Sequence, residues 1–328
     1  MKEIFVTRKI HPAGLALLKK AGYKVTVYPK DQMIEKKELL AGVKGKDAVL
    51  SLLTDKIDED VFKAAGPRLK VVANYAVGFD NVDLQAAKKH NVVVTNTPSD
   101  KVNESVAEET FALMMTLARR IAEADHFAKR GQYKGWAPML LNGVDVYGKT
   151  LGLIGAGRIG SMVARRAVNG FGMKLIYSDM RPNPELEKQL GAKKVSMEAL
   201  LKKADFISLH VPLLPSTRHL ISTKQFALMK PGAFLINTAR GPVVDEKALL
   251  KALKAKKIAG AGIDVFECEP AIDCDLRDNL ELKKFENVIL TPHIASATEA
   301  ARRDMAEIAA KNIIAVLKGK KALTPAKV

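Results

Sequence analysis

Short runs of apolar residues alternate with helical patterns along the first part of the chain. Runs rich in β-branched residues predict strands, and apolar residues spaced three and four apart predict the helices between them. Strands are predicted at residues 4–7, 24–27, 48–52, 69–73 and 92–95, and helices include 13–20, 58–65 and 84–90. Because strands that alternate with helices are typical of a parallel sheet with crossover connections, we expect an α/β unit here.

A long helix and a loop separate this unit from a second one. The helix is predicted over residues 104–129, and a segment containing Gly, Trp and Pro follows at 131–148. A second alternating series predicts strands at residues 150–154, 174–178, 206–210, 234–237, 260–263 and 288–291. Residues 298–318 predict a final helix with no strand after it, which we expect to pack back on an earlier element.

Composition and charge restrict the class of protein. The 328 residues suffice for two domains, and no apolar run approaches the roughly 18 residues that span a bilayer. We expect no membrane segment and no signal peptide, and therefore a cytoplasmic location. The net charge of +17 favours anionic ligands, but the lysines lie beside glutamates without stacking aromatics, so nucleic acid is not the expected partner. The cysteines and histidines predict neither a disulfide framework nor a metal site.

A glycine-rich turn follows the first strand of the second series. It has the pattern G-x-G-x-x-G, with an apolar strand before it and a helical pattern after it. Such a turn binds the pyrophosphate of a dinucleotide, because its glycines allow a tight bend and close approach, and the helix N-terminus supplies unpaired amides. The predicted cofactor-binding residues of the turn are Gly155, Gly157, Arg158, Ile159 and Gly160.

Asp179 stands where such a turn needs a carboxylate. It follows the strand at 174–178, about 20 residues downstream, and can accept hydrogen bonds from the adenosine ribose. Its charge would repel the 2′-phosphate of NADP, so NAD is the predicted cofactor, while Arg181 leaves NADP as the alternative. A nearby match to the P-loop pattern, from Gly143 to Thr150, precedes a strand instead of following one, and we interpret it as coincidence.

Reactive side chains follow three strands of the second series. Arg240, Glu269 and His293 come after the strands at 234–237, 260–263 and 288–291. We expect them to lie close together, because the carboxyl ends of parallel strands meet at one edge of a sheet. An arginine suits a carboxylate, a histidine transfers protons near neutral pH, and a carboxylate orients the histidine and favours its protonated form. The set suits reduction of a 2-oxo acid or oxidation of a 2-hydroxy acid.

Several segments of the chain resemble the D-isomer-specific 2-hydroxyacid dehydrogenases. They are residues 77–83 (VGFDNVD), 95–98 (TNTP), 155–160 (GAGRIG), 210–213 (HVPL), 237–241 (NTARG), 262–266 (GIDVF) and 291–294 (TPHI). The resemblance covers nearly the whole chain. It implies two Rossmann-like or flavodoxin-like domains with parallel sheets and an active site in the interdomain cleft. The substrate domain would comprise residues 1–98 and 294–328, and the NAD-binding Rossmann domain residues 99–293.

The resemblance also implies roles for individual residues. Arg240 would bind the substrate carboxylate and carbonyl, His293 would be the general acid and base, and Glu269 would be its partner. Backbone amides of Val77 and Gly78 would complete the carboxylate site. Asp264 would hold the nicotinamide carboxamide. The full set of implied cofactor contacts in this part of the chain is Val211, Pro212, Thr217, Thr238, Ala239, Asp264 and His293.

Members of this family usually form homodimers through the cofactor domain, so a homodimer is expected. Trp136 is similar to an aromatic of glyoxylate/hydroxypyruvate reductases that reaches the neighbouring subunit's active site, and dimer packing is its alternative role. We therefore predict an NAD(P)-dependent reductase of a small 2-oxo acid such as glyoxylate or hydroxypyruvate. The alternatives are D-lactate, phosphoglycerate or phosphite dehydrogenase, and a dinucleotide-sensing scaffold that resembles the C-terminal-binding corepressors.

Overall fold

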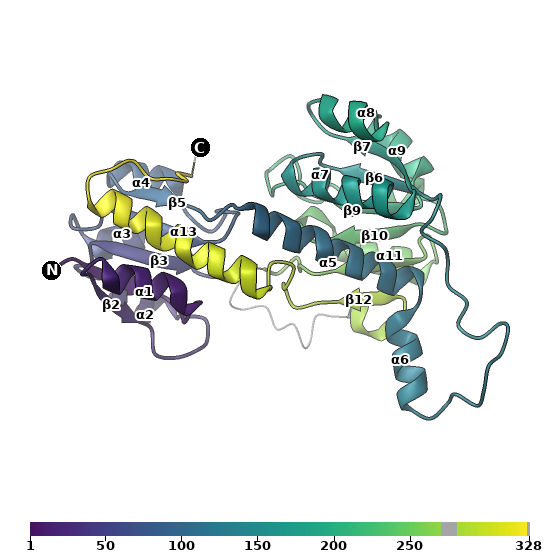
Figure 1. The fold of residues 1–328 in the computed structure, drawn as a ribbon, viewed down its shortest axis with the longest axis horizontal. Coiled ribbons are helices and arrows are strands. Elements are labelled where there is room, and N and C mark those ends of the chain that lie inside the picture. The colour runs from purple at the N-terminus through teal and green to yellow at the C-terminus, as the bar shows by residue number, and fades with distance from the viewer. Residues whose placement is uncertain (270–280, 327–328) are drawn as a thin grey trace. The chain divides into compact units, whose positions relative to one another are not determined.

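The computed structural model describes residues 1–269 and 281–326 of the chain. Contacts between residues divide it into two units (Figure 1). Among the described residues, unit 1 contains 1–102 and 296–326, and unit 2 contains 103–269 and 281–295. Each unit has a parallel sheet with helices on it, so the predicted fold class is confirmed.

Unit 1 is built on a five-stranded sheet with the strand order β2-β1-β3-β4-β5. The strands are β1 Glu3–Val6, β2 Lys24–Val27, β3 Ala48–Leu52, β4 Val71–Tyr75 and β5 Val93–Thr95. The helices between them are α1 Pro12–Lys20, α2 Lys36–Val43, α3 Glu59–Ala65 and α4 Leu84–Lys89. β4 begins later than predicted, because Leu69 still belongs to the turn that precedes it, where its N–H donates to the carbonyl oxygen of Gly66 at 3.3 Å.

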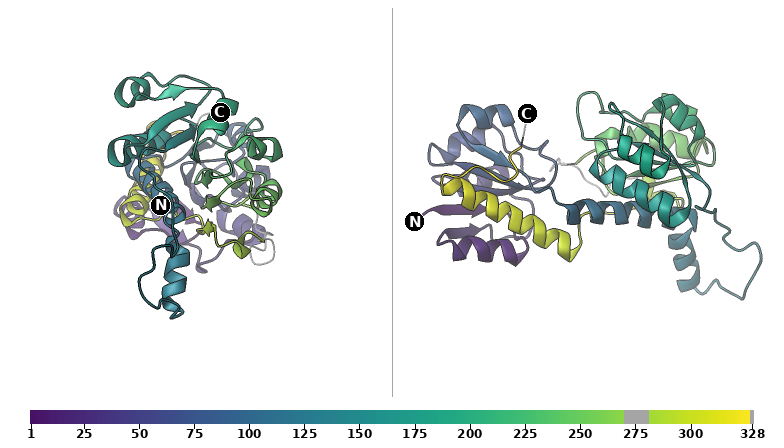
Figure 2. Two further views of the ribbon diagram at one scale, coloured as in Figure 1. Left: turned by 90° about the vertical axis from the view of Figure 1, so that its right-hand side faces the viewer. Right: turned by 45° about the horizontal axis from the view of Figure 1, so that its top comes forward.

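The final helix, α13 (Glu299–Leu317), belongs to unit 1 and packs beside α1 (Figures 1 and 2). Alternate strand residues such as Ile4 and Leu50 form a buried cluster with Met305 of α13. The other strand face is buried against α2, α3 and α4. The contact with α1 is close, since a Cβ on Gly14 would lie 2.5 Å from the carbonyl oxygen of Ala306. The final helix therefore packs back on earlier elements, as predicted.

Unit 2 is built on a seven-stranded sheet with the strand order β12-β11-β10-β9-β6-β7-β8. The strands are β6 Thr150–Ile154, β7 Lys174–Ser178, β8 Lys193–Lys194, β9 Phe206–Leu209, β10 Phe234–Asn237, β11 Gly260–Ile263 and β12 Val288–Leu290. The helices that follow them include α7 Arg158–Arg165, α8 Pro184–Leu190, α9 Met197–Lys203, α10 Thr223–Leu228 and α11 Glu246–Lys254. The P-loop match opens no helix, because Thr150 begins β6.

The helix predicted over residues 104–129 is broken, so the prediction of a single helix was wrong. α5 covers Asp100–Ala118 and α6 covers Ile121–Lys129, and α6 leaves α5 at an angle (Figure 2). Between them Arg120 adopts a left-handed backbone conformation with φ 53°, and its guanidinium pairs with Glu123 at 2.6 Å. Val144 N–H donates to the carbonyl oxygen of Ala118 at 2.8 Å. A loop distant in sequence thus ends α5.

None of the helices in residues 1–269 and 281–326 combines the length and the apolar character needed to cross a membrane.

Candidate active site

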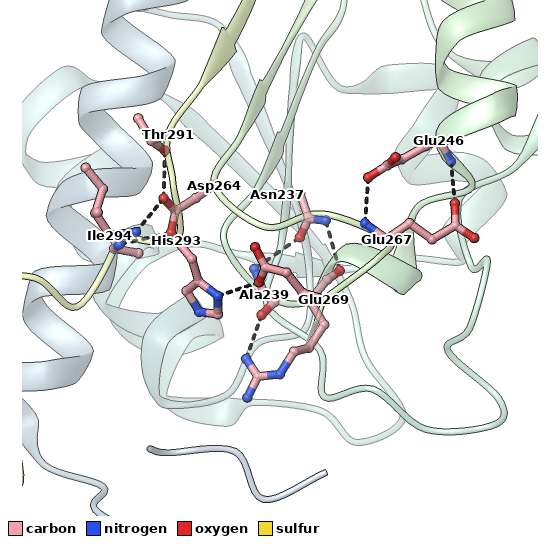
Figure 3. Close-up of polar contacts among 11 residues, drawn as sticks. Asn237, Ala239, Glu246, Asp264, Glu267, Glu269, Thr291, His293 and Ile294 are labelled. Atoms are coloured by element: carbon pink, nitrogen blue, oxygen red, sulfur yellow. Dashed lines mark hydrogen bonds and ion pairs between the residues drawn. The ribbon is translucent and has the colours of Figure 1, made fainter. Parts of the chain in front are cut away.

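Three segments at the carboxyl edge of the unit 2 sheet carry the predicted reactive residues. β10, β11 and β12 are neighbours, and their final residues pair directly, Asn237 with Ile263 and Ile263 with Leu290. Because the strands end in register, the segments after them begin from one edge of the sheet. Arg240, Glu269 and His293 lie on these segments. Figure 3 shows Glu269 and His293 side by side.

His293 and Glu269 form a hydrogen-bonded pair. Imidazole Nδ1 lies 2.6 Å from carboxylate Oε2, and the two side chains are 25% and 24% exposed. A carboxylate can only accept, so Nδ1–H is the donor and Nε2 is left to exchange a proton with another molecule. The partial exposure leaves the pair in reach of a small ligand. The geometry is that of an oriented general acid and base.

The backbone at His293 is held in an uncommon conformation by Asp264. His293 has φ 53°, in the left-handed region, and its N–H donates to the carbonyl oxygen of Asp264 at 2.8 Å. The carboxylate of Asp264, which is fully buried, accepts from Thr291 Oγ1 at 2.7 Å and from Ile294 N–H at 2.8 Å. Its other oxygen accepts from Ala295 N–H at 2.9 Å. Asp264 therefore fixes the segment that carries His293 (Figure 3).

The segment that carries Arg240 is fixed in a similar way by Asn237. The buried side chain of Asn237 donates to the carbonyl oxygen of Arg240 at 3.0 Å and accepts from Ala239 N–H at 3.1 Å. Arg240 Nη1 donates to the carbonyl oxygen of Ala239 at 2.7 Å. Gly241 has no room for a side chain, since a Cβ there would lie 1.8 Å from the carbonyl oxygen of Phe266. Thr238 Oγ1 lies 3.0 Å from Thr110 Oγ1 on α5.

A pair of acidic residues holds the backbone before Glu269. Glu267 N–H donates to the carboxylate of Glu246 at 2.6 Å, and Glu246 N–H donates to that of Glu267 at 3.1 Å. His219 Nε2 lies 2.5 Å from the Glu267 carboxylate. Burial raises the pKa of Glu246, and the neighbouring charges of Glu267 and Glu269 raise it further. Cys268 is disulfide-bonded, which the sequence did not predict, and the other cysteine, Cys274, lies outside the described residues.

The glycine-rich turn joins β6 to α7 as its pattern predicts. Gly155 has φ 96°, and a Cβ there would lie 2.5 Å from the carbonyl oxygen of His210. A Cβ on Gly160 would lie 2.2 Å from the carbonyl oxygen of Gly155, so both positions require glycine. A Cβ on Gly157 would meet no atom within 4 Å. The turn thus packs tightly at two glycines and leaves open space at the third, where a phosphate could approach the backbone.

Asp179 contacts this turn directly. It follows β7, and its Oδ2 accepts from Ala156 N–H at 2.7 Å, while Oδ1 accepts from Arg181 N–H at 3.2 Å. Asn183 Nδ2 donates to the carbonyl oxygen of Ala156 at 2.8 Å. The structure therefore brings the turn and the predicted ribose-binding carboxylate together, within one sheet edge.

The segment after β9 closes against the same turn. The carbonyl oxygen of His210 is the atom that packs against Gly155. The Nε2 atom of His210 lies 2.8 Å from Ser208 Oγ. Burial lowers the pKa of His210 to about 3, so this ring is neutral at physiological pH. Thr217 Oγ1 donates to the carbonyl oxygen of Pro212 at 2.6 Å and accepts from Leu214 N–H at 2.8 Å. Thr217 thus shapes the loop that also contains Val211.

Three other predicted site residues are not on the segments that follow the strands of the unit 2 sheet. Val77 and Gly78 follow β4 in unit 1, and Trp136, in the segment after α6, is 83% exposed. Sequence reasoning missed three residues that hold the site, namely Asn237, Glu246 and Thr291. Asn237 and Thr291 stand inside the segments that carry Arg240 and His293, and this position in the sequence could have indicated their role. Nothing in the sequence indicates the role of Glu246, because its contact with Glu267 joins residues 21 positions apart.

Known proteins resemble this chain over nearly its full length. A family model described as "D-isomer specific 2-hydroxyacid dehydrogenase, NAD binding domain" matches residues 111–295. A glyoxylate reductase of Thermococcus litoralis is 48% identical, over 97% of this chain and 94% of its own length. A solved structure from Thermus thermophilus has a TM-score of 0.92 and 41% identity, covering 99% of this chain and 100% of that one. A glyoxylate reductase structure from Paecilomyes thermophila has a TM-score of 0.83 and 31% identity, with 99% and 98% coverage.

Proposed function

Because the chain belongs to the D-isomer specific 2-hydroxyacid dehydrogenase family, we propose that it reduces glyoxylate and related small 2-oxo acids, hydroxypyruvate included. It is an NAD-dependent oxidoreductase that acts on CH–OH groups. The observation that carries the proposed chemistry is the hydrogen bond between His293 and Glu269. The names of similar proteins support glyoxylate as the substrate.

The proposed roles follow from the residue types at the sheet edge. Arg240 binds the substrate carboxylate, because a guanidinium donates two parallel hydrogen bonds to it. His293 donates a proton from Nε2 to the carbonyl oxygen as that oxygen becomes a hydroxyl, and takes a proton back in the reverse reaction. Glu269 holds the imidazole by Nδ1 so that Nε2 keeps its orientation through both steps.

The dinucleotide fits the residues of the glycine-rich turn. The open space at Gly157 admits the pyrophosphate, and Asp179 lies beside the turn to accept the ribose hydroxyls. When bound, NADH supplies the hydride that reduces the carbonyl carbon. The further cofactor contacts proposed are Arg158, Ile159, Val211, Pro212, Thr217, Thr238, Ala239 and Asp264. The charge of Asp179 favours NAD over NADP, and Arg181 keeps NADP as the alternative.

A substrate panel tests the proposal. Purified protein is mixed with NADH or NADPH and with glyoxylate, hydroxypyruvate, pyruvate or phosphohydroxypyruvate, and absorbance at the reduced cofactor's band is followed. We expect glyoxylate to be reduced with NADH, and His293→Gln to lose about 100-fold to 10,000-fold of kcat. If NADH binds to the wild-type protein but none of the four acids is reduced, the proposed function is wrong.

A homodimer is also proposed, through the segment that includes α6. This helix has no buried residue, and large apolar side chains on residues 121–147 are exposed. They are Ile121, Tyr133, Trp136, Met139, Leu140, Val144 and Tyr147. An exposed apolar group of this kind is typical of a subunit interface. Sedimentation should give a dimer, and Trp136→Ala should weaken it. A higher KM for the substrate in a variant that is still dimeric would instead place Trp136 at an active site. The cytoplasmic location stays a prediction.

A further inference from the structure

The turn after β4 in unit 1 has the carbonyl groups of three successive residues held by hydrogen bonds. The carbonyl oxygen of Ala76 accepts from Thr97 N–H at 2.8 Å. That of Val77 accepts from Asn96 Nδ2 at 2.7 Å, and that of Gly78 accepts from Asn74 Nδ2 at 3.0 Å. Two of the three donors are therefore side-chain amides, supplied by residues on either side of the turn in sequence.

These bonds fix where the amide groups point. In a planar trans peptide the C=O and N–H bonds point in opposite directions, so holding a carbonyl orients the N–H of the next residue away from its donor. The N–H groups concerned belong to Val77, Gly78 and Phe79, and none of them donates a hydrogen bond within the described part of the chain. A hydrogen bond accepted by a carbonyl also polarises the peptide and makes its N–H a stronger donor. Successive unpaired N–H groups of this kind bind anions.

Asn74 is itself fixed within the core of unit 1. It is fully buried in β4, and its Oδ1 accepts from Ser51 Oγ at 3.1 Å and from Asn81 Nδ2 at 3.2 Å. Asn81 Nδ2 in turn donates to the carbonyl oxygens of Leu52 at 3.0 Å and Asp55 at 2.9 Å. The side chain of Asn74 therefore cannot turn away from Gly78 without breaking other buried hydrogen bonds.

Asn96 is fixed by the C-terminal segment. Its N–H donates to the carbonyl oxygen of Thr324 at 3.2 Å, and Thr324 Oγ1 donates to its carbonyl oxygen at 2.6 Å. Thr324 is held in turn by Asn312, a fully buried residue of α13, whose Nδ2 donates to Thr324 Oγ1 at 2.8 Å. A continuous series of hydrogen bonds thus leads from α13 through Thr324 and Asn96 to the carbonyl of Val77.

We propose that Asn96 and Asn74 are positioning residues for the substrate carboxylate, and that Thr324 is part of the same support. They act through the Val77, Gly78 and Phe79 amides, whose N–H groups they set toward the anion before it arrives. Groups oriented in advance bind more tightly, because no ordering cost remains to be met at binding. That the bound anion is the substrate carboxylate rests on the proposed function. That Asn96 and Asn74 orient the three amides rests on the hydrogen bonds alone.

Kinetics of matched variants test the proposal. Asn96→Leu keeps the side-chain size but removes the donor, and should raise the KM for glyoxylate about tenfold, with kcat within about threefold of wild type. Thr324→Val should also raise the KM for glyoxylate. Thr324→Ser, which keeps the hydroxyl, should have a KM close to that of the wild type. The Kd of NADH, measured by fluorescence, should not change. A KM unchanged by Asn96→Leu would overturn the proposal. So would a variant in which substrate affinity, kcat and NADH affinity all fall by the same factor together with a lower melting temperature, because that would show a general loss of structure.

A second measurement separates this proposal from the proposed function. Titration of 15N-labelled protein and NADH with oxamate, a small carboxylate that is not reduced, should move the amide signals of Val77 and Gly78 in the wild type. Asn96→Leu should need about tenfold more oxamate for the same shift. If the signals move but no 2-oxo acid is reduced, the proposed function fails and the anion site stands. If glyoxylate is reduced but oxamate leaves both signals in place, the proposal about the amides is wrong.

Discussion

Nδ1 of His293 lies 2.6 Å from Oε2 of Glu269, although the two residues follow different strands of the unit 2 sheet. The short contact sets the tautomer of the ring and leaves Nε2 as the nitrogen that reaches the substrate. Since Asp264 and the Glu246–Glu267 pair fix the two backbones separately, the distance does not depend on the side chains alone.

Glu269→Gln should lower kcat for glyoxylate reduction by about 100-fold, because the amide can still accept from Nδ1 but brings no charge to stabilise the protonated ring. The KM for NADH should stay as it is. The control is Glu59→Gln, which changes a Glu–His contact in unit 1, where Glu59 Oε1 lies 3.1 Å from His90 Nε2. A kcat equal to that of the control would show that Glu269 has no part in the reaction.

Arg240→Lys should lower kcat/KM for glyoxylate by about 100-fold with NADH still bound, because an ammonium cannot donate the two parallel bonds that a carboxylate accepts from a guanidinium. Steady-state rates and NADH fluorescence measure the two effects. Arg8→Lys, at an arginine that pairs with exposed Asp31 at 2.7 Å, provides the matched control. Retention of full activity by Arg240→Lys would exclude bidentate binding.

Asp264→Asn should reduce both stability and turnover. Three donors converge on this buried carboxylate, and the amide of asparagine would oppose one of them, so the free energy of unfolding should fall by about 1–3 kcal/mol. Turnover should fall because His293 loses its support. Asp47→Asn, at a carboxylate 2% exposed in unit 1, should lower stability without changing kcat. If Asp264→Asn changed only the affinity for NADH, its role would be the implied carboxamide contact.

Asp179→Asn should raise the ratio of kcat/KM with NADPH to that with NADH about tenfold, since it removes the charge that repels a 2′-phosphate. Asparagine Oδ1 can still accept from Ala156 N–H, so the turn should keep its shape. Initial rates with both cofactors measure the ratio, and Asp31→Asn serves as an exposed control. An unchanged ratio would mean that Asp179 does not select the cofactor.

His210 should make the protein less stable in acid. The pKa of His210 in the folded chain is about 3 against 6.5 for an exposed histidine, so below pH 6.5 the unfolded chain binds a proton that the folded chain does not. Its contribution to stability is complete above pH 6.5 and is lost as the pH falls toward 3. At pH 5 the loss should be about 2 kcal/mol. Urea unfolding at several pH values should show that the free energy of unfolding falls less between pH 7 and pH 5 in His210→Gln than in the wild type. An equal fall in both proteins would refute the prediction.

Much of the fold and part of the site could be predicted from the sequence, because they depend on local pattern. The strand series and the glycine turn follow from residues near one another in the chain. The approach of Arg240, Glu269 and His293 to one edge follows from the geometry of parallel strands, and the pairing of β10, β11 and β12 agrees with it.

The features that were missed depend on contacts between distant segments. The break at Arg120 arises where Val144 binds the end of α5, and helical periodicity across residues 104–129 cannot reveal it. Asn96 and Asn74 are short polar residues near strand ends, and only their partners show that they hold a turn. Thr324 becomes relevant solely because α13 returns to unit 1.

The return of α13 has a consequence for the newborn chain on the ribosome. One face of the unit 1 sheet is covered by α13 together with α1, yet residues 96–298 must be translated between β5 and α13. At about 5–20 residues per second the wait is on the order of ten to forty seconds. During it the apolar face around Ile4 and Leu50 lacks the buried residues of α13 and is covered only in part, by α1, while the strands of unit 2 are being made. Chaperone binding in the cell should therefore concentrate on the earliest-made strands.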